Sequence, residues 1–177
     1  MLIRKISSTK RWDINAVQNL ITRPNPLFTG DAISDLRTQG NTISVWETPD
    51  LSEANIRPIL ATLALNGDKL DKVVYVTLNE EELIDKGLIL VPVEGRCDSV
   101  VDMSILQRHR DISEVDYWHL GFLAEYIYER IALGFVYTAT LSTIKSYVLN
   151  LIDTQKVDAC KIGDKKREQL KLPTLPK

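Results

Sequence analysis

Apolar residues follow two different periods between residues 42 and 93. Three runs there are rich in β-branched and aromatic side chains, which suit a pleated, half-buried surface, and they predict β-strands. Between the runs, apolar residues recur at spacings of three and four, which predicts α-helices. The strands are predicted at 42–46, 72–78 and 88–93, and the helices at 55–66 and 79–87. Strands that alternate with helices through short connections predict an α/β fold, with a small, mostly parallel sheet and two βαβ crossovers over residues 42–93.

Patterned segments also flank this region. Alternation over residues 2–7 predicts a strand that extends the sheet. Helical spacing predicts short helices at 14–21 and 31–38 before the core, and a C-terminal helical pair at 113–131 and 141–152 after it. The stretch 131–152 is apolar enough to suggest a membrane span, but it contains Lys145, and a charged side chain near the middle of a span costs about 2.5–3.5 kcal/mol. A buried helix is the better explanation, and no membrane is expected as a partner.

The distribution of charge distinguishes the C-terminal segment from the rest of the chain. Of the 177 residues, 44% are hydrophobic and 26% are charged, and the net charge of −2 excludes a domain that is basic as a whole. From Lys156 onward, however, seven lysine and arginine residues stand against three acids. We therefore expect a single α/β domain over residues 1–155 and a basic tail over 156–177. No apolar leader follows Met1, which predicts a cytoplasmic protein.

The sequence lacks the residues that several kinds of catalysis need. No glycine-rich phosphate loop and no Gly-x-Ser-x-Gly turn occurs, and two cysteines and two histidines are too few and too scattered for a structural zinc site. No cofactor is therefore expected. Cys97 follows Arg96, a cation that favours a thiolate, but no histidine base stands nearby in the sequence.

Acidic residues follow each of the three predicted core strands. The carboxyl ends of parallel strands meet at one edge of a sheet, where carboxylates can hold Mg²⁺. The four acids are Glu47, Asp50, Glu80 and Glu94. They support an alternative interpretation as a Mg²⁺-dependent, nuclease-like enzyme. The same acids also suit helix N-termini, where they need no metal.

A histidine between two arginines, Arg108-His109-Arg110, forms a candidate site for an anion. Neighbouring cations favour the neutral imidazole, and guanidinium groups bind phosphate or carboxylate groups well. The competing interpretation is a solvated loop before a helix that Ser113 and Asp116 would cap.

Aromatic residues concentrate in the predicted C-terminal helices. Eight of the twelve aromatic residues fall within 31 positions: Tyr117, Trp118, Phe122, Tyr126, Tyr128, Phe135, Tyr137 and Tyr147. Neighbouring helical positions point about 100° apart, so a single stripe cannot bury all of them. Exposed tyrosine and tryptophan mark interaction surfaces. The predicted partner-binding residues are Tyr117, Trp118, Tyr126 and Tyr128, with Lys165, Lys166 and Arg167 of the basic tail as a second contact.

Residues 34–38 (SDLRT) and 41–46 (NTISVW) resemble a group of small bacterial proteins, and the likeness continues towards Lys72. That group has no assigned chemistry, and the resemblance implies a place in a mobile or defence-type gene cassette. Together with the aromatic surface, it favours a non-catalytic accessory, regulatory or immunity subunit of a bacterial defence or toxin–antitoxin-type system. Such a subunit would bind another protein or itself. A nucleic-acid binder, acting through the basic tail or through its partner, is a further alternative.

Overall fold

The structure is a computed structural model that describes residues 1–12, 30–36, 40–94 and 100–173. The helix predicted at 14–21 and the thiol of Cys97 lie outside these residues. The chain divides into two compact units. Unit 1 consists of Met1–Val45, Val74–Val91 and Asp111–Tyr137, and unit 2 of Trp46–Val73, Pro92–Arg110 and Thr138–Lys177.

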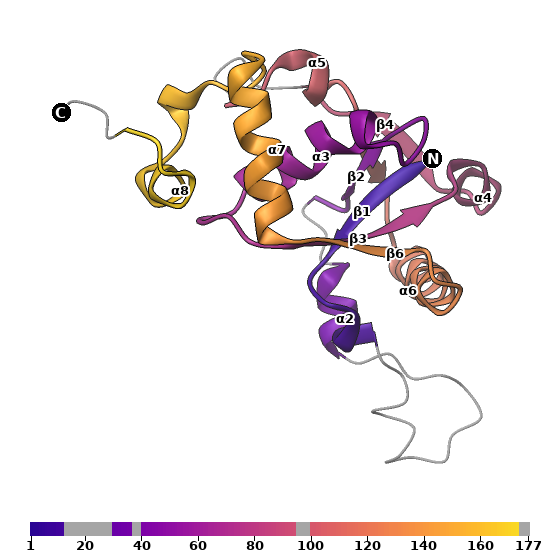
Figure 1. The fold of residues 1–177 in the computed structure, drawn as a ribbon. Helices are drawn as coiled ribbons and strands as arrows, with labels where there is room; N and C mark the ends of the chain where they lie inside the picture. Colours follow the sequence, from indigo (N-terminus) through magenta and orange to yellow (C-terminus); the bar gives the residue numbers. More distant parts are fainter. Residues whose placement is uncertain (13–29, 37–39, 95–99, 174–177) are drawn as a thin grey trace. The chain divides into compact units, whose positions relative to one another are not determined.

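Strands and helices mix along the chain, which confirms the general α/β class (Figure 1). The strands are β1 (Leu2–Ile6), β2 (Ile43–Glu47), β3 (Val73–Leu78), β4 (Ile89–Pro92), β5 (His109–Ser113) and β6 (Val136–Ala139). The α-helices are α2 (Gly30–Asp35), α3 (Glu53–Leu65), α4 (Glu80–Asp85), α5 (Met103–Leu106), α6 (Tyr117–Ala132), α7 (Leu141–Asp153) and α8 (Asp164–Leu170). Two 3₁₀ helices are η1 (Thr9–Trp12) and η2 (Ala159–Lys161).

The prediction of a mostly parallel sheet was wrong. The six strands lie in the order β4-β5-β2-β1-β3-β6, and neighbouring strands are antiparallel throughout. In the β1–β3 pair, Leu2 lies opposite Leu78 and Ile6 lies opposite Val74. The strand at the amino terminus is therefore a central strand, whereas we expected it to extend the sheet.

β2, β3 and β4 are not neighbours of one another in the sheet, although they share one direction. Because each adjacent pair is antiparallel, β2, β3 and β4 all run in the same direction, as two βαβ crossovers require. However, β1 lies between β2 and β3, and β5 lies between β4 and β2. β2 and β3 are thus separated by one strand of opposite direction, and so are β2 and β4, which puts each of these pairs about 10 Å apart at the usual strand spacing. β3 and β4, which flank α4, are separated by three strands.

The core of unit 1 is built from alternate strand residues and from one face each of α2, α4 and α6. On β1 and β3 these residues occupy facing positions of the register, so one face of the sheet is apolar. Its buried residues include Leu2, Ile6, Ile43, Val45, Val76, Leu78, Leu83, Ile112, Leu123 and Ile127. A fully buried leucine or isoleucine stabilises a fold by about 1.5–3 kcal/mol, so this cluster fixes α6 on the sheet.

Local signals define the ends of α4 as predicted. The side chain of Asn79 accepts a hydrogen bond from the backbone N–H of Glu81 at 3.0 Å, which caps the helix. After the helix, Gly87 adopts a φ of 83°, which a residue with a Cβ rarely adopts.

A buried carboxylate organises the amino-terminal part of unit 1. Asp35, the last residue of α2, accepts hydrogen bonds from the backbone N–H and the hydroxyl of Ser7 and from the indole N–H of Trp12. Arg11 Nη1 lies 3.5 Å from the same carboxylate, whose side chain is only 4% exposed. Arg4 of β1 donates to the backbone oxygen of Asp35 at 2.6 Å. These contacts tie β1 and η1 to α2.

In unit 2, α3 packs against α7 (Figure 1). Both helices bury apolar residues at spacings of three and four: Ile59, Leu60, Ala64, Ile144, Val148 and Leu151. Arg57 of α3 donates to the side-chain oxygen of Asn150 at 2.9 Å and lies over the Tyr147 ring. α7 covers most of the stretch weighed as a membrane span, and none of the helices in the described ranges is long and apolar enough to cross a membrane.

The residues after Lys156 belong to unit 2 as far as the structure describes them. Val157 forms an antiparallel bridge with Val101. The side-chain amide of Gln169 in α8 bonds both the N–H and the carbonyl of Leu70, at 2.7 and 3.0 Å. Through residue 173, the segment predicted as a basic tail is therefore folded structure with its own helices.

Candidate functional site

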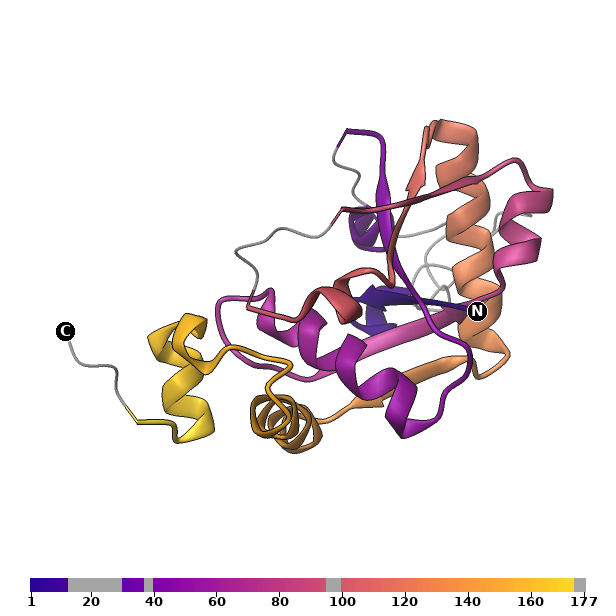
Figure 2. The same cartoon turned by 90° about the horizontal axis from the view of Figure 1, so that it is seen from above.

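A ladder of three stacked aromatic rings runs along α6. The rings of Trp118 and Phe122 have centroids 6.3 Å apart and are inclined by 15°, and those of Phe122 and Tyr126 are 5.7 Å apart and inclined by 11°. The three residues are spaced by four, so the helix places them above one another on one face. We call Trp118, Phe122 and Tyr126 the aromatic ladder. α4 lies beside this helix (Figure 2).

The inner end of the ladder is buried and hydrogen-bonded. Tyr126 is 7% exposed, and its hydroxyl accepts a hydrogen bond from the backbone N–H of Asn79 at 3.0 Å. Burial, together with a hydrogen bond to Glu82, raises the pKa of Tyr126 to about 12. This ring therefore joins α6 to the start of α4 and holds the rest of the ladder in place.

Tyr126 is expected to keep its proton to about pH 12 in the folded protein, which the absorbance of tyrosinate would show. In the unfolded chain its pKa returns to 10, so the unfolded state loses this proton first. The stability that the neutral hydroxyl provides is complete below pH 10 and is lost as the pH rises towards 12. Tyr126→Phe should remove both the late ionisation and this loss of stability. If the late step persists in that variant, another tyrosine causes it.

The outer end of the ladder is open to solvent. Trp118 is 60% exposed, and its neighbour Tyr117 is 93% exposed. The backbone beneath them is fixed by a capping box, in which the Asp116 carboxylate accepts the N–H of His119 at 2.8 Å and the His119 ring lies against Asp116. The N–H of His119 lowers the pKa of Asp116, so this cap stays ionised to a lower pH than an ordinary aspartate. The two exposed rings thus project from a well-defined helix start.

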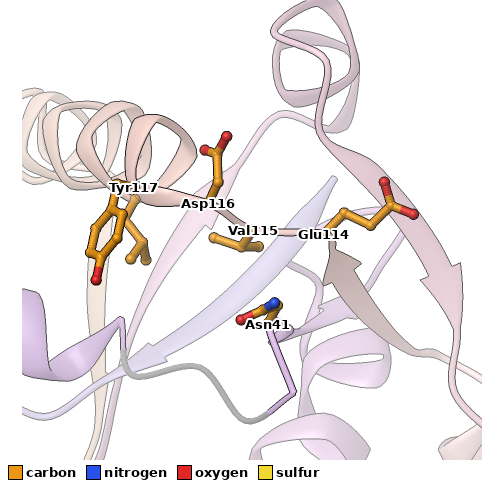
Figure 3. Close-up of a pocket in the computed structure, with 6 residues that line it drawn as sticks. Asn41, Glu114, Val115, Asp116 and Tyr117 are labelled. Atoms are coloured by element: carbon orange, nitrogen blue, oxygen red, sulfur yellow. The ribbon is translucent and has the colours of Figure 1, made fainter.

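A cavity of about 490 Å³ adjoins this helix start (Figure 3). It is lined by Asn41, Glu114, Val115, Asp116, Tyr117 and Leu120. Figure 3 shows Asn41 and Val115 facing each other beside the Tyr117 ring, while the carboxylates of Glu114 and Asp116 point away from that ring. The N–H of Val115 donates to the Asn41 carbonyl at 3.0 Å, which joins the two segments.

The backbone around the cavity is strained. Asn41 and Glu114 have φ angles of 59° and 56°, a region that costs residues with a Cβ roughly 1–2 kcal/mol. Among the described residues that line the cavity, the titratable groups are the carboxylates of Glu114 and Asp116 and the phenol of Tyr117. Asp116 is already used as a helix cap.

The four aromatic residues that we predicted to bind a partner differ in their exposure to solvent. Tyr117 and Trp118 are exposed, Tyr128 is half-buried, and Tyr126 belongs to the core of unit 1. Phe122, which the sequence-based choice omitted, connects Trp118 to Tyr126. The spacing of four between these three residues is the signal that would have identified it.

Two of the four proposed metal ligands have partners of their own. Glu47 pairs with Arg110 at 2.6 Å. Asp50 accepts hydrogen bonds from Ser52 N–H and the Asn55 amide, and these bonds lower its pKa. The other two acids are Glu80, in the first turn of α4, and the exposed Glu94. Within the described ranges, no group of three or more histidine, cysteine or acidic side chains could hold a metal ion. The nuclease-like interpretation therefore gains no support there.

The arginines of the proposed anion site are engaged within unit 2. Arg110 pairs with Glu47, and Arg108 donates to the backbone oxygen of Asn55 at 3.1 Å. The His109 ring stacks on Trp46 with centroids 4.9 Å apart. His109 and Arg110 begin strand β5, so the predicted loop is a strand.

The proposed basic contact residues also differ in their surroundings. Lys165 is exposed. Lys166 donates to the carbonyl of Leu65 at 2.5 Å, at the end of α3. Arg167 is 6% exposed and donates to the backbone oxygens of Ala159 and Pro173. Of the three, only Lys165 presents its side chain fully to solvent.

Comparisons of the chain with protein families, with curated proteins and with solved structures find no match.

Proposed function

We propose that the protein acts by binding another polypeptide at the outer end of α6. The observation that carries this proposal is the exposure of Tyr117 and Trp118, 93% and 60%, at a helix start whose backbone is fixed by a capping box. The remainder of the aromatic ladder is half-buried or buried in unit 1. Two large rings left in water at a single point are a common feature of protein-binding surfaces.

The ladder supports binding by holding the Trp118 ring in one orientation. Stacking on Phe122 restricts the indole before a partner arrives, so less side-chain entropy is lost on binding. The adjoining cavity offers space for a side chain of the partner beside Tyr117. Preorganised rings around a concave site are the usual anchors of a small interface. Whether the protein is an accessory, regulatory or immunity subunit of a defence system stays a prediction.

A displayed library of random peptides tests this proposal without knowledge of the natural partner. Selection on the wild-type protein is expected to enrich peptides that no longer bind when Tyr117 and Trp118 are both replaced by serine. Burial of these two rings contributes roughly 1.5–3 kcal/mol each, so their loss weakens binding at least tenfold.

Leu133→Ser provides the matched control, because Leu133 follows the other end of α6 and is 70% exposed. Peptides selected on the wild type should bind this variant normally. Selection that enriches no sequences, or only sequences that bind the double variant equally well, would refute the proposed function.

A further inference from the structure

α6 and the neighbouring α4, which together we call the binding face, carry an excess of negative charge. Residues 79–91 and 114–133, which contain α4 and α6, hold eight carboxylates and two basic side chains, Lys86 and Arg130. Seven of the eight carboxylates belong to exposed residues. The acids are Glu80, Glu81, Glu82, Asp85, Glu114, Asp116, Glu125 and Glu129.

Of the two cations, Arg130 is half-buried against the protein itself, whereas Lys86 is exposed and lies over an aromatic ring. Arg130 donates to the carbonyl of Thr77 at 2.9 Å and lies 3.7 Å from the centroid of the Phe135 ring. Lys86 lies over the Phe122 ring, 5.9 Å from its centroid. Seven exposed acids against one exposed lysine leave these helices with an acidic excess.

Lys86 shows how the aromatic ladder binds a cation. It lies over the middle ring, where the negative face of the π-system attracts an ammonium group. Trp118 is the next ring of the ladder, it is more exposed than the other two, and indole is the strongest of the aromatic cation binders. Glu125 is exposed seven positions along the helix, so it points in nearly the same direction about 10 Å away.

Charge distinguishes between the occupants of this face. A second copy related by a twofold axis would place the same acids opposite one another, which costs free energy. A nucleic acid or an anionic membrane surface would meet the same repulsion. A basic polypeptide gains from both features, since its lysine or arginine side chains can bind the Trp118 ring and the carboxylates beside it.

We infer that the partner of α6 presents a basic segment, with one lysine or arginine over the Trp118 ring and others near Glu125 and the acids of α4. This inference rests on the proposed function and specifies the chemistry of the partner. It places the acidic side of the protein, rather than its basic C-terminal segment, at the interface.

A fluorescein-labelled octalysine peptide tests the inference by fluorescence anisotropy. Trp118→Ala is expected to weaken binding about five- to tenfold, because it removes the cation–π contact. Glu125→Gln should weaken it about two- to threefold and reduce its salt dependence between about 20 and 150 mM salt. In the wild type, peptide binding should also change tryptophan emission, since Trp12 and Trp46 are only 2% and 3% exposed and Trp118 is the accessible ring.

Glu168→Gln is the matched control, because it neutralises one exposed carboxylate on α8. It should leave octalysine binding unchanged. The inference is overturned if Trp118→Ala and Glu125→Gln bind octalysine as tightly as the wild type, or if octaglutamate binds equally well. Self-association of the wild type that Trp118→Ala abolishes also overturns it, in favour of a second copy.

The composition of the displayed peptides separates this inference from the proposed function. Peptides that need Tyr117 and Trp118 and are rich in lysine or arginine support both. Peptides that need the two rings but are neutral or acidic support the binding site and overturn the basic partner.

Discussion

Replacement of Asp35 by alanine is expected to lower the free energy of unfolding by about 3 kcal/mol. The carboxylate is 4% exposed and accepts hydrogen bonds from Ser7 and from the Trp12 indole, with Arg11 at 3.5 Å. Alanine leaves the indole N–H of Trp12, which is 2% exposed, without its acceptor, and a buried donor left unpaired costs about 1–3 kcal/mol. It also removes the carboxylate that Ser7 and Arg11 contact. Urea denaturation followed by tryptophan emission measures the change, because Trp12 itself is buried.

Two control variants separate the hydrogen bonds from the charge. Asp35→Asn keeps one oxygen as an acceptor but removes the charge, so it should lose about half as much stability. Asp85→Ala removes an exposed acid of α4 and should change stability by less than about 0.5 kcal/mol. If Asp35→Ala were as stable as Asp85→Ala, η1 and α2 would not depend on this carboxylate.

The elements in the middle of the chain could be predicted because their signals are local. β2, β3 and β4 are runs of residues with a high preference for strands, and Asn79 and Gly87 mark the two ends of α4 by side-chain and backbone chemistry alone. Even the common direction of these strands follows from the helices between them. Which strand lies beside which in the sheet, however, depends on residues far away in the sequence.

Two strands of the sheet, β5 and β6, were not predicted, and β5 is the one that separates β4 from β2. β5 has the sequence HRDIS, in which Ile112 is the only apolar residue and the only buried one. β6 has four residues and follows a helix closely, so it has no period of its own. Both strands are stabilised by the neighbouring strands of the sheet. The pattern of apolar residues within β5 or β6 does not indicate which strands those neighbours are.

The candidate site could be predicted only in part, for a related reason. The concentration of aromatic residues identified α6, and the helical period required that some of them be exposed. Which ones are exposed depends on how the helix lies on the sheet: Tyr126 meets Asn79 of a distant segment, whereas Trp118 meets no such cover. The cavity depends on the contact between Asn41 and Val115, which are far apart in the sequence.

Replacement of Arg167 by alanine is expected to destabilise unit 2 by about 3 kcal/mol. The guanidinium is almost fully buried, and it donates to the carbonyl of Ala159 at 2.5 Å and to that of Pro173 through two nitrogens. Hydrogen bonds from a charged donor contribute about 1.5–3 kcal/mol each, and the long side chain also adds packing. Urea denaturation monitored by far-ultraviolet circular dichroism gives the measurement.

Arg167→Lys keeps the charge but lacks the planar group that reaches two carbonyls at once, so it should recover only about 1 kcal/mol of the stability lost in the alanine variant. Lys165→Ala, at an exposed position of the same helix, should leave stability within about 0.5 kcal/mol of the wild type. A different result is expected if this segment is a contact for nucleic acid: Arg167→Ala would then weaken the binding of an oligonucleotide and leave the unfolding curve unchanged. Because burial of the guanidinium withdraws its charge from solvent, we expect the change in stability instead.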